Sequence, residues 1–449
     1  MNLRKLLLLT SLVLLICQFS FAQVAVRPDH TVAAKAIAAN KSTGKPVQVV
    51  PTGTVVGKAQ ARPPIWLAKN LGAKQVVKPS ALPSFCNHDF GSYYVFCPSG
   101  LQGAYQTSQI LNANGGKGTV IAIVDAYAYS SAESNLAQFN SDMGLPACTT
   151  GNGCFTSVNL SPYDGSGSGW DLESMLDLES AHGMAPNAKI VYIQAYDSSY
   201  DGLGQAVDIA AKGCPASVYC ASYGIASSPA ADIVSNSWSG GEDSYYDFYF
   251  TQSKVLLFSS GDYGSWPSQG FVGYPCSATT VTCVGGTSLY VNGSLQRTSE
   301  TGWAGSGGGC SDEEPIPSYQ GLNGSGVCSP TRASPDVAAV ADPDTGFATY
   351  ISNPYYGTGY YLVGGTSLAC PVTAGLVANI DTARVSFGKS KLTFLNTGVY
   401  AAAAGNYNYF LYDVTSGNNG YPAGFQFDLV TGLGNMTGKT LANRFFGLP

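Results

Sequence analysis

The sequence predicts an α/β fold in which a parallel β-sheet is covered by helices on both faces. Four short runs are rich in Val and Ile and end in small or polar residues: GTVIAIVDA (118–126), AKIVYIQA (188–195), DIVSNSWS (232–239) and KVLLFSSGD (254–262). Segments with helical composition lie between them, such as 131–144 and 202–213. Near-continuous apolar strands that alternate with helices are typical of parallel sheets buried on both faces. In such folds the chemistry collects at the carboxyl ends of the strands, where Asp125 and Asp262 lie.

The composition indicates a loop-rich globular protein with a sizeable core. The chain has 449 residues, of which 45% are hydrophobic, only 11% are charged and 54 are glycine. This composition excludes a disordered or repetitive protein and leaves room for one large domain or two ordinary ones. With few ionisable groups, acidification changes the net repulsion less than it does in a highly charged protein.

Residues 1–22 are predicted to be a secretory signal peptide. Arg4 and Lys5 precede the apolar run LLLLTSLVLLI, and the small residues Ser20 and Ala22 stand at a plausible cleavage point. The apolar run is short for a membrane span. No other long apolar run is present. We therefore expect a secreted protein, extracellular or periplasmic, that does not contact a membrane once the signal is removed.

Charge divides the rest of the chain into two parts. Residues 23–85 carry nine Lys/Arg and one acid, Asp29, a net charge of +8. Residues 86–449 carry eleven Lys/Arg and 27 acids, a net charge of −16. The first part is either a solvated basic linker or a propeptide-like segment held partly by charge on the acidic remainder of the chain. In the second case the attachment would loosen as the acids protonate.

The cysteines favour an oxidising compartment. Twelve are present, of which Cys17 lies in the predicted signal. Ten fall into close pairs that could each close one local loop, although spacing does not fix the connectivity: Cys86 and Cys97, Cys148 and Cys154, Cys214 and Cys220, Cys276 and Cys283, Cys310 and Cys328. Cys370 is left over and is expected to be a buried, unpaired thiol. There is no CxxC metal motif and only three histidines, so zinc is not expected.

Two carboxylates stand four residues apart in DLESMLDLESAHG (171–183). This spacing places Glu173 and Asp177 side by side on one helical face, where like charges repel. The pair is therefore a solvated face, a metal site or the base of a catalytic apparatus. His182 follows Glu173 by nine residues, on roughly the opposite face of such a helix.

A candidate nucleophile begins an apolar helical run in GGTSLACPVTAGLVANI (364–380). Ser367 would lie at the helix N-terminus, where the partial positive charge favours a developing anion, although the same position suits an ordinary N-cap serine. Pro371 is expected in the first turn, where its missing N–H costs little. A nucleophilic serine needs a base, and Glu173 can serve if Asp177 shares its proton and orients it.

A third acid follows a predicted strand in SSGDYG (259–264). The carboxyl of Asp262 can donate a hydrogen bond to an oxyanion only when it is protonated. Three acids and one serine therefore form a consistent catalytic set only if the protein works in acid.

On these motifs the sequence resembles the sedolisins, the serine-carboxyl peptidases, over most of residues 98–437. ESMLD matches the family's base and partner acid with Glu173 and Asp177, SSGDYG its oxyanion aspartate with Asp262, and GTS its nucleophile with Ser367. Residues 300–311 and 334–346 are also similar to sedolisin sequence. The resemblance implies a three-layer subtilisin-like fold with a central parallel sheet flanked by helices. It also implies an acid-acting serine endopeptidase that forms an acyl-enzyme.

The resemblance further implies one structural calcium ion. YDVTSGNNG supplies Asp413 and the carbonyl of Val414, and GFQFDLVTGLG supplies the carbonyls of Gly424 and Gln426 and the side chain of Asp428. These are hard oxygen ligands of the kind calcium prefers. Gln426 stands where the family usually has glycine. The alternative is an ordinary loop rich in Asp and Gly.

Two departures from the family pattern, the role of Asp125 and two competing interpretations follow. The segment before the catalytic domain is only about sixty residues long, Tyr263 replaces a serine common in the family, and Asp125 either extends the proton network or caps a strand. One competing interpretation is a subtilisin-type triad of Asp125, His182 and Ser367, whose chain order is right for it. The other is a catalytically inactive secreted binding module on the same scaffold. We expect a monomer whose partners are protein or peptide substrates rather than nucleic acid.

Overall fold

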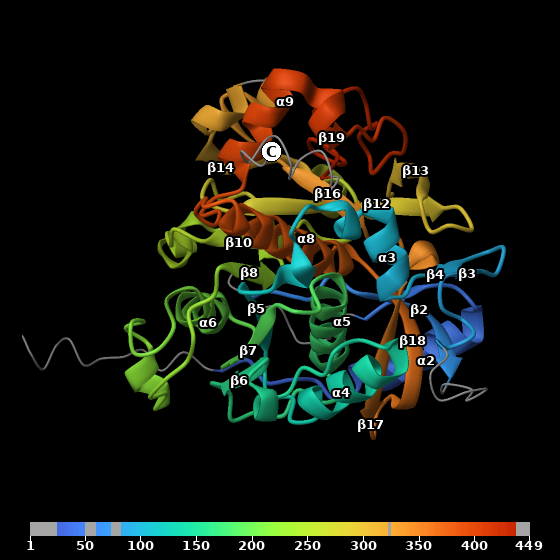
Figure 1. The fold of residues 1–449 in the computed structure, drawn as a ribbon. Coiled ribbons are helices and arrows are strands. Elements are labelled where there is room, and N and C mark those ends of the chain that lie inside the picture. The colour runs from blue at the N-terminus through green and yellow to red at the C-terminus, as the bar shows by residue number, and fades with distance from the viewer. Residues whose placement is uncertain (1–24, 50–59, 73–81, 322–324, 437–449) are drawn as a thin grey trace, which may run out of the picture.

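The computed structural model describes residues 25–49, 60–72, 82–321 and 325–436, and the predicted signal peptide lies outside this part. An eight-stranded sheet with the strand order β13-β12-β10-β8-β5-β7-β6, with β16 also paired to β12, forms the centre of the molecule (Figure 1). All neighbouring strands in it run parallel except β12 and β13. The predicted parallel sheet is confirmed. Its strands are β5 (Val120–Ala126), β6 (Phe155–Asn159), β7 (Lys189–Ala195), β8 (Ile233–Asn236), β10 (Val255–Ser259), β12 (Thr282–Val291), β13 (Arg297–Gly302) and β16 (Val337–Val340).

Helices bury both faces of this sheet, which gives three layers. Alternate residues of β5 belong to two separate apolar clusters: Ile121 and Ile123 to one, Ala122 and Val124 to the other. This alternation follows from the period of two in a strand. The first cluster contains the apolar side of α5 (Trp170–Met184) and α8 (Thr366–Ser386), and the second contains that of α6 (Tyr200–Lys212) (Figure 1). The predicted layered fold is therefore present.

A second, antiparallel sheet lies beside the first and has the order β1-β2-β18-β17. Its strands are β1 (Val47–Gln48), β2 (Trp66–Gly72), β17 (Phe347–Asn353) and β18 (Gly357–Gly364). Strand β18 leads directly into α8, so this sheet fixes the start of the helix that carries Ser367. Helix α2 (Val32–Thr43) buries Val32, Ala33 and Ala36 in the first cluster. Part of the basic segment 23–85 is thus built into the body of the protein.

The remaining elements are shorter and frame the two sheets. The other α-helices are α3 (Pro98–Ala104), α4 (Ala132–Met143), α7 (Trp266–Gln269) and α9 (Asn396–Phe410). The small antiparallel pairs are β3 (His88–Asp89) with β4 (Tyr94–Val95), β9 (Gly240–Gly241) with β11 (Gly273–Tyr274), β14 (Gly309–Pro315) with β15 (Thr331–Ser334), and β19 (Leu411–Tyr412) with β20 (Asn435–Met436).

Five disulfides each close a short local loop, with sequence separations of 6 to 18 residues. They join the five close cysteine pairs of the sequence. Cys370 is free and buried, as expected. Its thiol accepts a hydrogen bond from the Ser235 hydroxyl at 3.3 Å.

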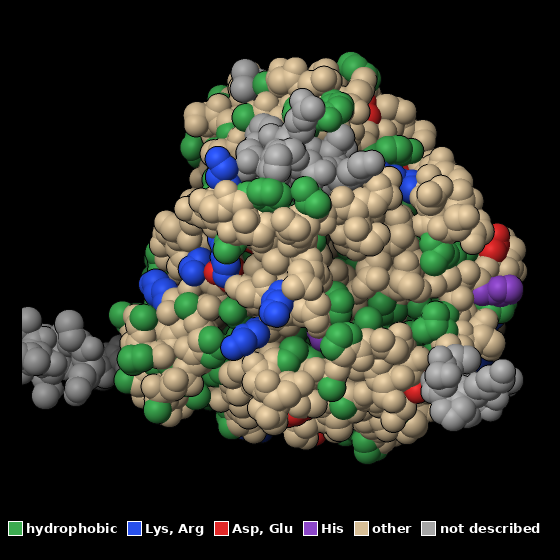
Figure 2. Space-filling model, viewed as in Figure 1, with side chains coloured by type: hydrophobic (Ala, Val, Ile, Leu, Met, Phe, Trp, Pro, Cys, Tyr) green, Lys and Arg blue, Asp and Glu red, His purple; other side chains and the backbone are tan. Residues whose placement is uncertain are grey.

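The surface reflects the low charge content. In Figure 2, uncharged polar groups and backbone cover most of the visible face, with scattered Lys and Arg side chains and few acids. Within the described ranges, no helix is long and apolar enough to cross a membrane.

Candidate active site

Ser367 is the second residue of α8, and a glycine with a positive φ angle precedes that helix. Gly365 has φ +116°, and a Cβ atom there would collide with the Pro64 carbonyl oxygen and lie 2.5 Å from Asp262 Oδ2. Only glycine fits this position without strain. The Ser367 side chain is fully buried and its Oγ forms no hydrogen bond. The first turn of α8 therefore presents a buried hydroxyl group without a hydrogen-bond partner.

Pro371 lies in the second turn of α8, not in the first turn as the sequence predicted, because the helix already begins at Thr366. Proline has no N–H to donate to the carbonyl four residues earlier, which is that of Ser367. The Ser237 hydroxyl takes this place, 3.2 Å from the Ser367 carbonyl oxygen. The same hydroxyl lies 2.9 Å from Asp177 Oδ1. Ser237, directly after β8, thus connects the backbone of Ser367 with the carboxyl of Asp177.

Glu173 and Asp177 lie on α5, which is buried on all sides. A solvated face is therefore excluded, since neither side chain is exposed to solvent. Burial raises the pKa of Glu173 well above its usual value, and the nearby carboxylates of Asp177 and Asp125 raise it further. The neighbouring Ser367 hydroxyl opposes this rise, although the two side chains form no hydrogen bond of standard geometry here. Hydrogen bonds between a nucleophile and its base are often long or poorly aligned in the absence of substrate.

Asp125, at the end of β5, lies within the same group of carboxyls. Burial raises its pKa to about 7, and neither of its oxygens has a hydrogen-bond partner. Burial likewise raises the pKa of Asp177 well above the usual range, the charge of Asp125 adds to this, and the Ser237 hydroxyl opposes it. The three carboxyls share one buried space, so they cannot all ionise together at moderate pH.

Asp262, after β10, contacts Thr366, the residue before Ser367. Its Oδ1 accepts hydrogen bonds from the backbone N–H and the hydroxyl of Thr366, both at 2.8 Å. Its Oδ2 has no partner. Burial raises the pKa of this carboxyl well above its usual value, and the two bonds from Thr366 oppose the rise. A neutral carboxylic acid can donate a hydrogen bond from the free oxygen.

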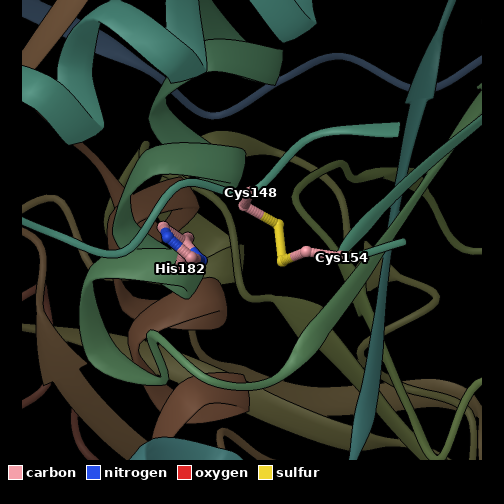
Figure 3. Close-up of side chains that lie close together, drawn as sticks. All are labelled: Cys148, Cys154 and His182. Atoms are coloured by element: carbon pink, nitrogen blue, oxygen red, sulfur yellow. A yellow bond between two sulfur atoms is a disulfide. The ribbon is translucent and has the colours of Figure 1, made fainter. Parts of the chain in front are cut away.

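His182 is far from this group. It lies at the other end of α5, and nine residues of helix separate it from Glu173, about 13 Å along the axis. Its Nε2 lies 3.0 Å from the Pro146 carbonyl oxygen, and burial lowers its pKa. Figure 3 shows the ring beside the disulfide between Cys148 and Cys154. Together with His182, the two cysteines could bind a metal only as free thiolates, and the disulfide between them leaves no free thiolate.

The predicted calcium ligands converge in the loops around β19 and β20. Asp413 Oδ2 accepts a hydrogen bond from the Gln426 N–H at 3.0 Å, and Asp428 Oδ2 accepts one from the Gly424 N–H at 2.9 Å. Gln426 adopts φ +65°, the backbone conformation that glycine favours. Among the described residues, no donor reaches the carbonyl oxygens of Val414, Gly424 or Gln426. Two carboxylates and three unused carbonyls fit a calcium ion.

A cavity of about 520 Å³ lies next to Pro64 and to Tyr263, the residue after Asp262. Tyr263 and Phe271 form an aromatic wall, with ring centroids 6.5 Å apart, and both rings are partly exposed. The other lining residues are Gln60, Arg62, Pro63, Pro64, Ser239, Gly240, Gly241 and Gln269. The two aromatic-rich segments of the sequence, 243–250 and 353–361, do not line this cavity.

Sequence reasoning missed three contributors to this region. Ser237 and Thr366 contact the acids directly, and residues 60–65 enter the site from the basic segment. The one available signal for Ser237 was its position in the polar end of the predicted strand run 232–239, where side chains reach the carboxyl edge of the sheet.

The fold and this site define a subtilase. The Subtilase family model matches residues 163–393, about half of the chain, and the chain belongs to this family. Within it, the chain is 30% identical to sedolisin of Pseudomonas sp. (strain 101) over 348 residues, which cover 71% of this chain and 56% of that protein. It is 30% identical to kumamolisin of Bacillus sp. (strain MN-32) over 381 residues, which cover 77% and 63%. The predicted relationship to the sedolisins is confirmed.

A solved structure agrees with the sequence relatives. Pseudomonas sedolisin (serine-carboxyl proteinase), complexed with two molecules of pseudo-iodotyrostatin, superimposes with a TM-score of 0.64 at 26% identity, covering 78% of this chain and 98% of that chain. Tripeptidyl-peptidase 1 of Bos taurus is 34% identical over 210 residues, 40% of this chain and 35% of that protein. The chain thus spans between half and two thirds of the length of the two bacterial relatives.

Proposed function

We propose that this chain is a secreted serine peptidase that hydrolyses peptide bonds of proteins in acid. The observation that carries the proposal is the convergence of Ser367 with the buried carboxyls of Glu173 and Asp177, with Asp262 bonded to the neighbouring Thr366. His182, the only histidine on these elements, lies at the wrong end of α5 for a subtilisin-type triad. The named relatives, sedolisin, kumamolisin and tripeptidyl-peptidase 1, support a serine peptidase.

The proposed roles follow from the protonation states that burial imposes. Glu173 acts as general base while the pair Glu173 and Asp177 carries one negative charge, and Asp177 orients Glu173. Asp262 stays neutral and donates a hydrogen bond from Oδ2. As pH rises, the pair gains a second charge and Asp262 ionises, so the donor is lost. As pH falls, the pair becomes fully protonated and the base is lost. A bell-shaped profile in the acid range follows.

The proposed reaction proceeds through an acyl-enzyme. Ser367 Oγ attacks the scissile carbonyl while Glu173 takes the hydroxyl proton. The backbone N–H of Ser367 and the neutral Asp262 stabilise the oxyanion. Glu173 returns the proton to the leaving amine, and water then hydrolyses the ester by the same route.

A pH–rate profile tests this proposal. The substrate is an unfolded protein, the range about pH 2 to 8 around the ordinary carboxyl pKa values, and the variants are Ser367→Ala and His182→Ala. We expect a maximum in acid, no activity in Ser367→Ala and unchanged kcat in His182→Ala. A maximum near neutrality that disappears in His182→Ala would instead support the subtilisin-type triad.

We propose that Asp413, Asp428 and the carbonyls of Val414, Gly424 and Gln426 hold one structural calcium ion. When bound, calcium would neutralise two carboxylates whose pKa values burial already raises. A chelator is expected to lower Tm, and calcium at 100 times its Kd adds about 2.7 kcal/mol. Asp428→Asn should remove the response to chelator. An unchanged Tm in the native chain would contradict the assignment.

A further inference from the structure

We propose that Glu314 and Asp247 form a proton-dependent clasp, which holds one wall of the cavity beside Tyr263 in acid and releases it when the shared proton is lost. Glu314 lies on β14, and Asp247 lies in the 3₁₀-helix η5 (Ser244–Phe250). The proposal rests on the proposed function and deepens it, because it adds a response to pH that is separate from the catalytic carboxyls. We call these two residues the carboxyl clasp.

Strands β9 and β11 form the wall that the carboxyl clasp supports. They pair antiparallel, Gly240 with Tyr274 and Gly241 with Gly273. Gly240 and Gly241 line the cavity of about 520 Å³, and so does Phe271, two residues before β11. A pair of strands this short is not stable by itself, so its position depends on the side chains that tie it to the rest of the chain.

Two carboxylates provide these ties, one for each strand of the wall. The Tyr274 hydroxyl donates a hydrogen bond to Asp247 Oδ1 at 2.7 Å, which joins β11 to η5. Glu242, the residue after β9, accepts hydrogen bonds from the Ser311 hydroxyl at 2.6 Å and from the Asp312 N–H at 2.8 Å. These two bonds join β9 to β14. The wall is therefore held from η5 on one strand and from β14 on the other.

The carboxyl clasp joins these two supports to each other. Glu314 and Asp247 form a hydrogen bond between their side chains. Such a bond needs a proton on one of the two groups, because a pair of carboxylates has no donor. The Glu314 side chain is buried, and its N–H donates to the Ser311 hydroxyl at 2.7 Å. The same stretch of β14 thus binds both Glu242 and Asp247.

The charges that face the pair explain why it keeps its proton. Burial raises the pKa of Glu314, to about 8, and the hydrogen bond and charge of Asp247 and the charge of Glu242 raise it further. The positive charge of Arg332, on β15, opposes this rise, but its guanidinium already forms an ion pair elsewhere. Tyr274 faces Asp247 from β11 and stays neutral, since burial raises its pKa. The proton belongs to the pair, because the two carboxyls titrate together.

Strand β14 also connects the carboxyl clasp to the turn that carries Asp262. Just before β14, the Gly307 N–H donates to the Gly261 carbonyl at 2.8 Å, and the Trp266 N–H donates to the Gly308 carbonyl at 2.8 Å. These backbone bonds contain no titrating group. We therefore expect the loss of the clasp to act on the wall and on substrate binding, and to leave the reacting groups in place.

The effect of pH follows from the shared proton. In acid, one carboxyl of the pair donates to the other, and η5 and β14 stay together. When the proton is lost, the hydrogen bond loses its donor and two negative charges repel each other across the contact. The supports of Tyr274 and Glu242 then move independently. The cavity wall becomes more mobile as pH rises, so the chain completes its substrate-binding surface only in acid.

Hydrogen exchange tests the clasp without peptidase activity when it is measured in the Ser367→Ala chain. The readout is the protection of residues 240–250, corrected for the intrinsic effect of pH on exchange, at about pH 5 and about pH 9, on either side of the raised pKa. We expect protection to fall by roughly two- to tenfold at the higher pH. Adding Glu314→Gln supplies an amide donor that does not titrate, so protection should then stay constant. An equal fall with and without Glu314→Gln, or no fall at all, would overturn the proposal.

Steady-state kinetics at the acid optimum tests the effect on the proposed peptidase. We expect KM for a peptide substrate to rise roughly two- to tenfold in Glu314→Ala, with kcat within about twofold, and to stay at the native value in Glu314→Gln. Asp312→Ala, at an exposed position of the same strand, is the control and should keep both constants. An unchanged KM in Glu314→Ala, or an equal rise in Glu314→Gln, would overturn the inference while the proposed function stands. If the native chain cleaves nothing in acid, the proposed function is wrong, and the exchange experiment alone decides whether the clasp exists.

Discussion

The two halves of α5 are equally buried and carry titratable groups, yet only one half holds the proposed site. Glu173 and Asp177 face the start of α8, and both oxygens of Glu173 lack partners. Further along, Glu179 Oε2 accepts a hydrogen bond from the Tyr350 N–H at 2.8 Å, and His182 Nε2 lies 3.0 Å from the Pro146 carbonyl oxygen.

Burial alone therefore does not distinguish a catalytic carboxyl. It raises the pKa of Glu179 well above its usual value, as it does for Glu173. The difference lies in what each carboxyl faces: a hydroxyl and further carboxyls in one case, and the backbone of β17 in the other. A perturbed pKa identifies a candidate site only together with a reacting partner.

The largest expected effect compares the two glutamates of this helix directly. Glu173→Gln removes the proposed base and should lower kcat by about 10²–10⁴ at the acid optimum. Glu179→Gln, a change of the same kind six residues further along α5, should leave kcat within about twofold. Steady-state kinetics on one peptide substrate measures both. Equal losses of kcat in the two variants would show that the two halves of α5 do not differ in function.

The next effect concerns the proposed oxyanion donor. Asp262→Ala should lower kcat by roughly 10²–10³, the cost of one oxyanion donor. Asp262→Asn keeps an acceptor for Thr366 and supplies an N–H donor that does not titrate. We expect it to recover part of the rate and to extend activity toward neutral pH. An identical alkaline limb in the native chain and Asp262→Asn would contradict a donor role for Asp262.

A smaller effect on activity is expected at Ser237, which the sequence did not identify as part of the site. Its hydroxyl lowers the pKa of Asp177, so Ser237→Ala should raise that pKa and move the acid limb of the kcat profile to higher pH. The change in kcat at the optimum should be within about tenfold. Ser235→Ala, two residues earlier on β8, is the matched control and should leave the limb in place. Coincident profiles would show that Ser237 does not act on Asp177.

The smallest effect is one of stability. The raised pKa of Glu179 means that the folded chain binds a proton which the unfolded chain releases above about pH 4. The carboxyl thus contributes stability that is fully present below that pH and is lost as pH rises toward the folded pKa. Glu179→Gln does not titrate, so its Tm relative to the native chain should increase from pH 3.5 to pH 6.5. A constant difference would mean that this carboxyl is not perturbed.

The sheet and its helices were predictable because near-continuous apolar runs alternate along the chain with segments of helical composition. The strand runs ending near Asp125 and Asp262 and the helix around Glu173 appear where the sequence placed them. The start of α8 was predicted too far along the chain, so Pro371 lies in the second turn instead of the first. Helix boundaries depend on local capping, here Gly365, and not on the apolar period.

The contribution of residues 60–65 could not be predicted for a different reason. QARPPI has no alternation and two prolines, so it is typical of a linker. Its backbone pairs with Ser198 and Ser239, more than a hundred residues away. Because this pairing uses main-chain atoms only, the pattern of side chains in the sequence does not reveal it. Ser237 was missed because one serine after a strand has no distinctive spacing.

The short disulfide loops bear on whether one molecule of this protein can be cleaved by another. Residues 60–65 enter the groove as an extended chain, and six extended residues span about 20 Å. Cys148 and Cys154 are six residues apart, yet their Cα atoms are held 4.9 Å from each other. A loop tied in this way cannot straighten to lie in the groove of a neighbouring molecule. If the chain has the proposed peptidase activity, reduction should therefore expose these loop tips to self-digestion before the buried sheet is attacked.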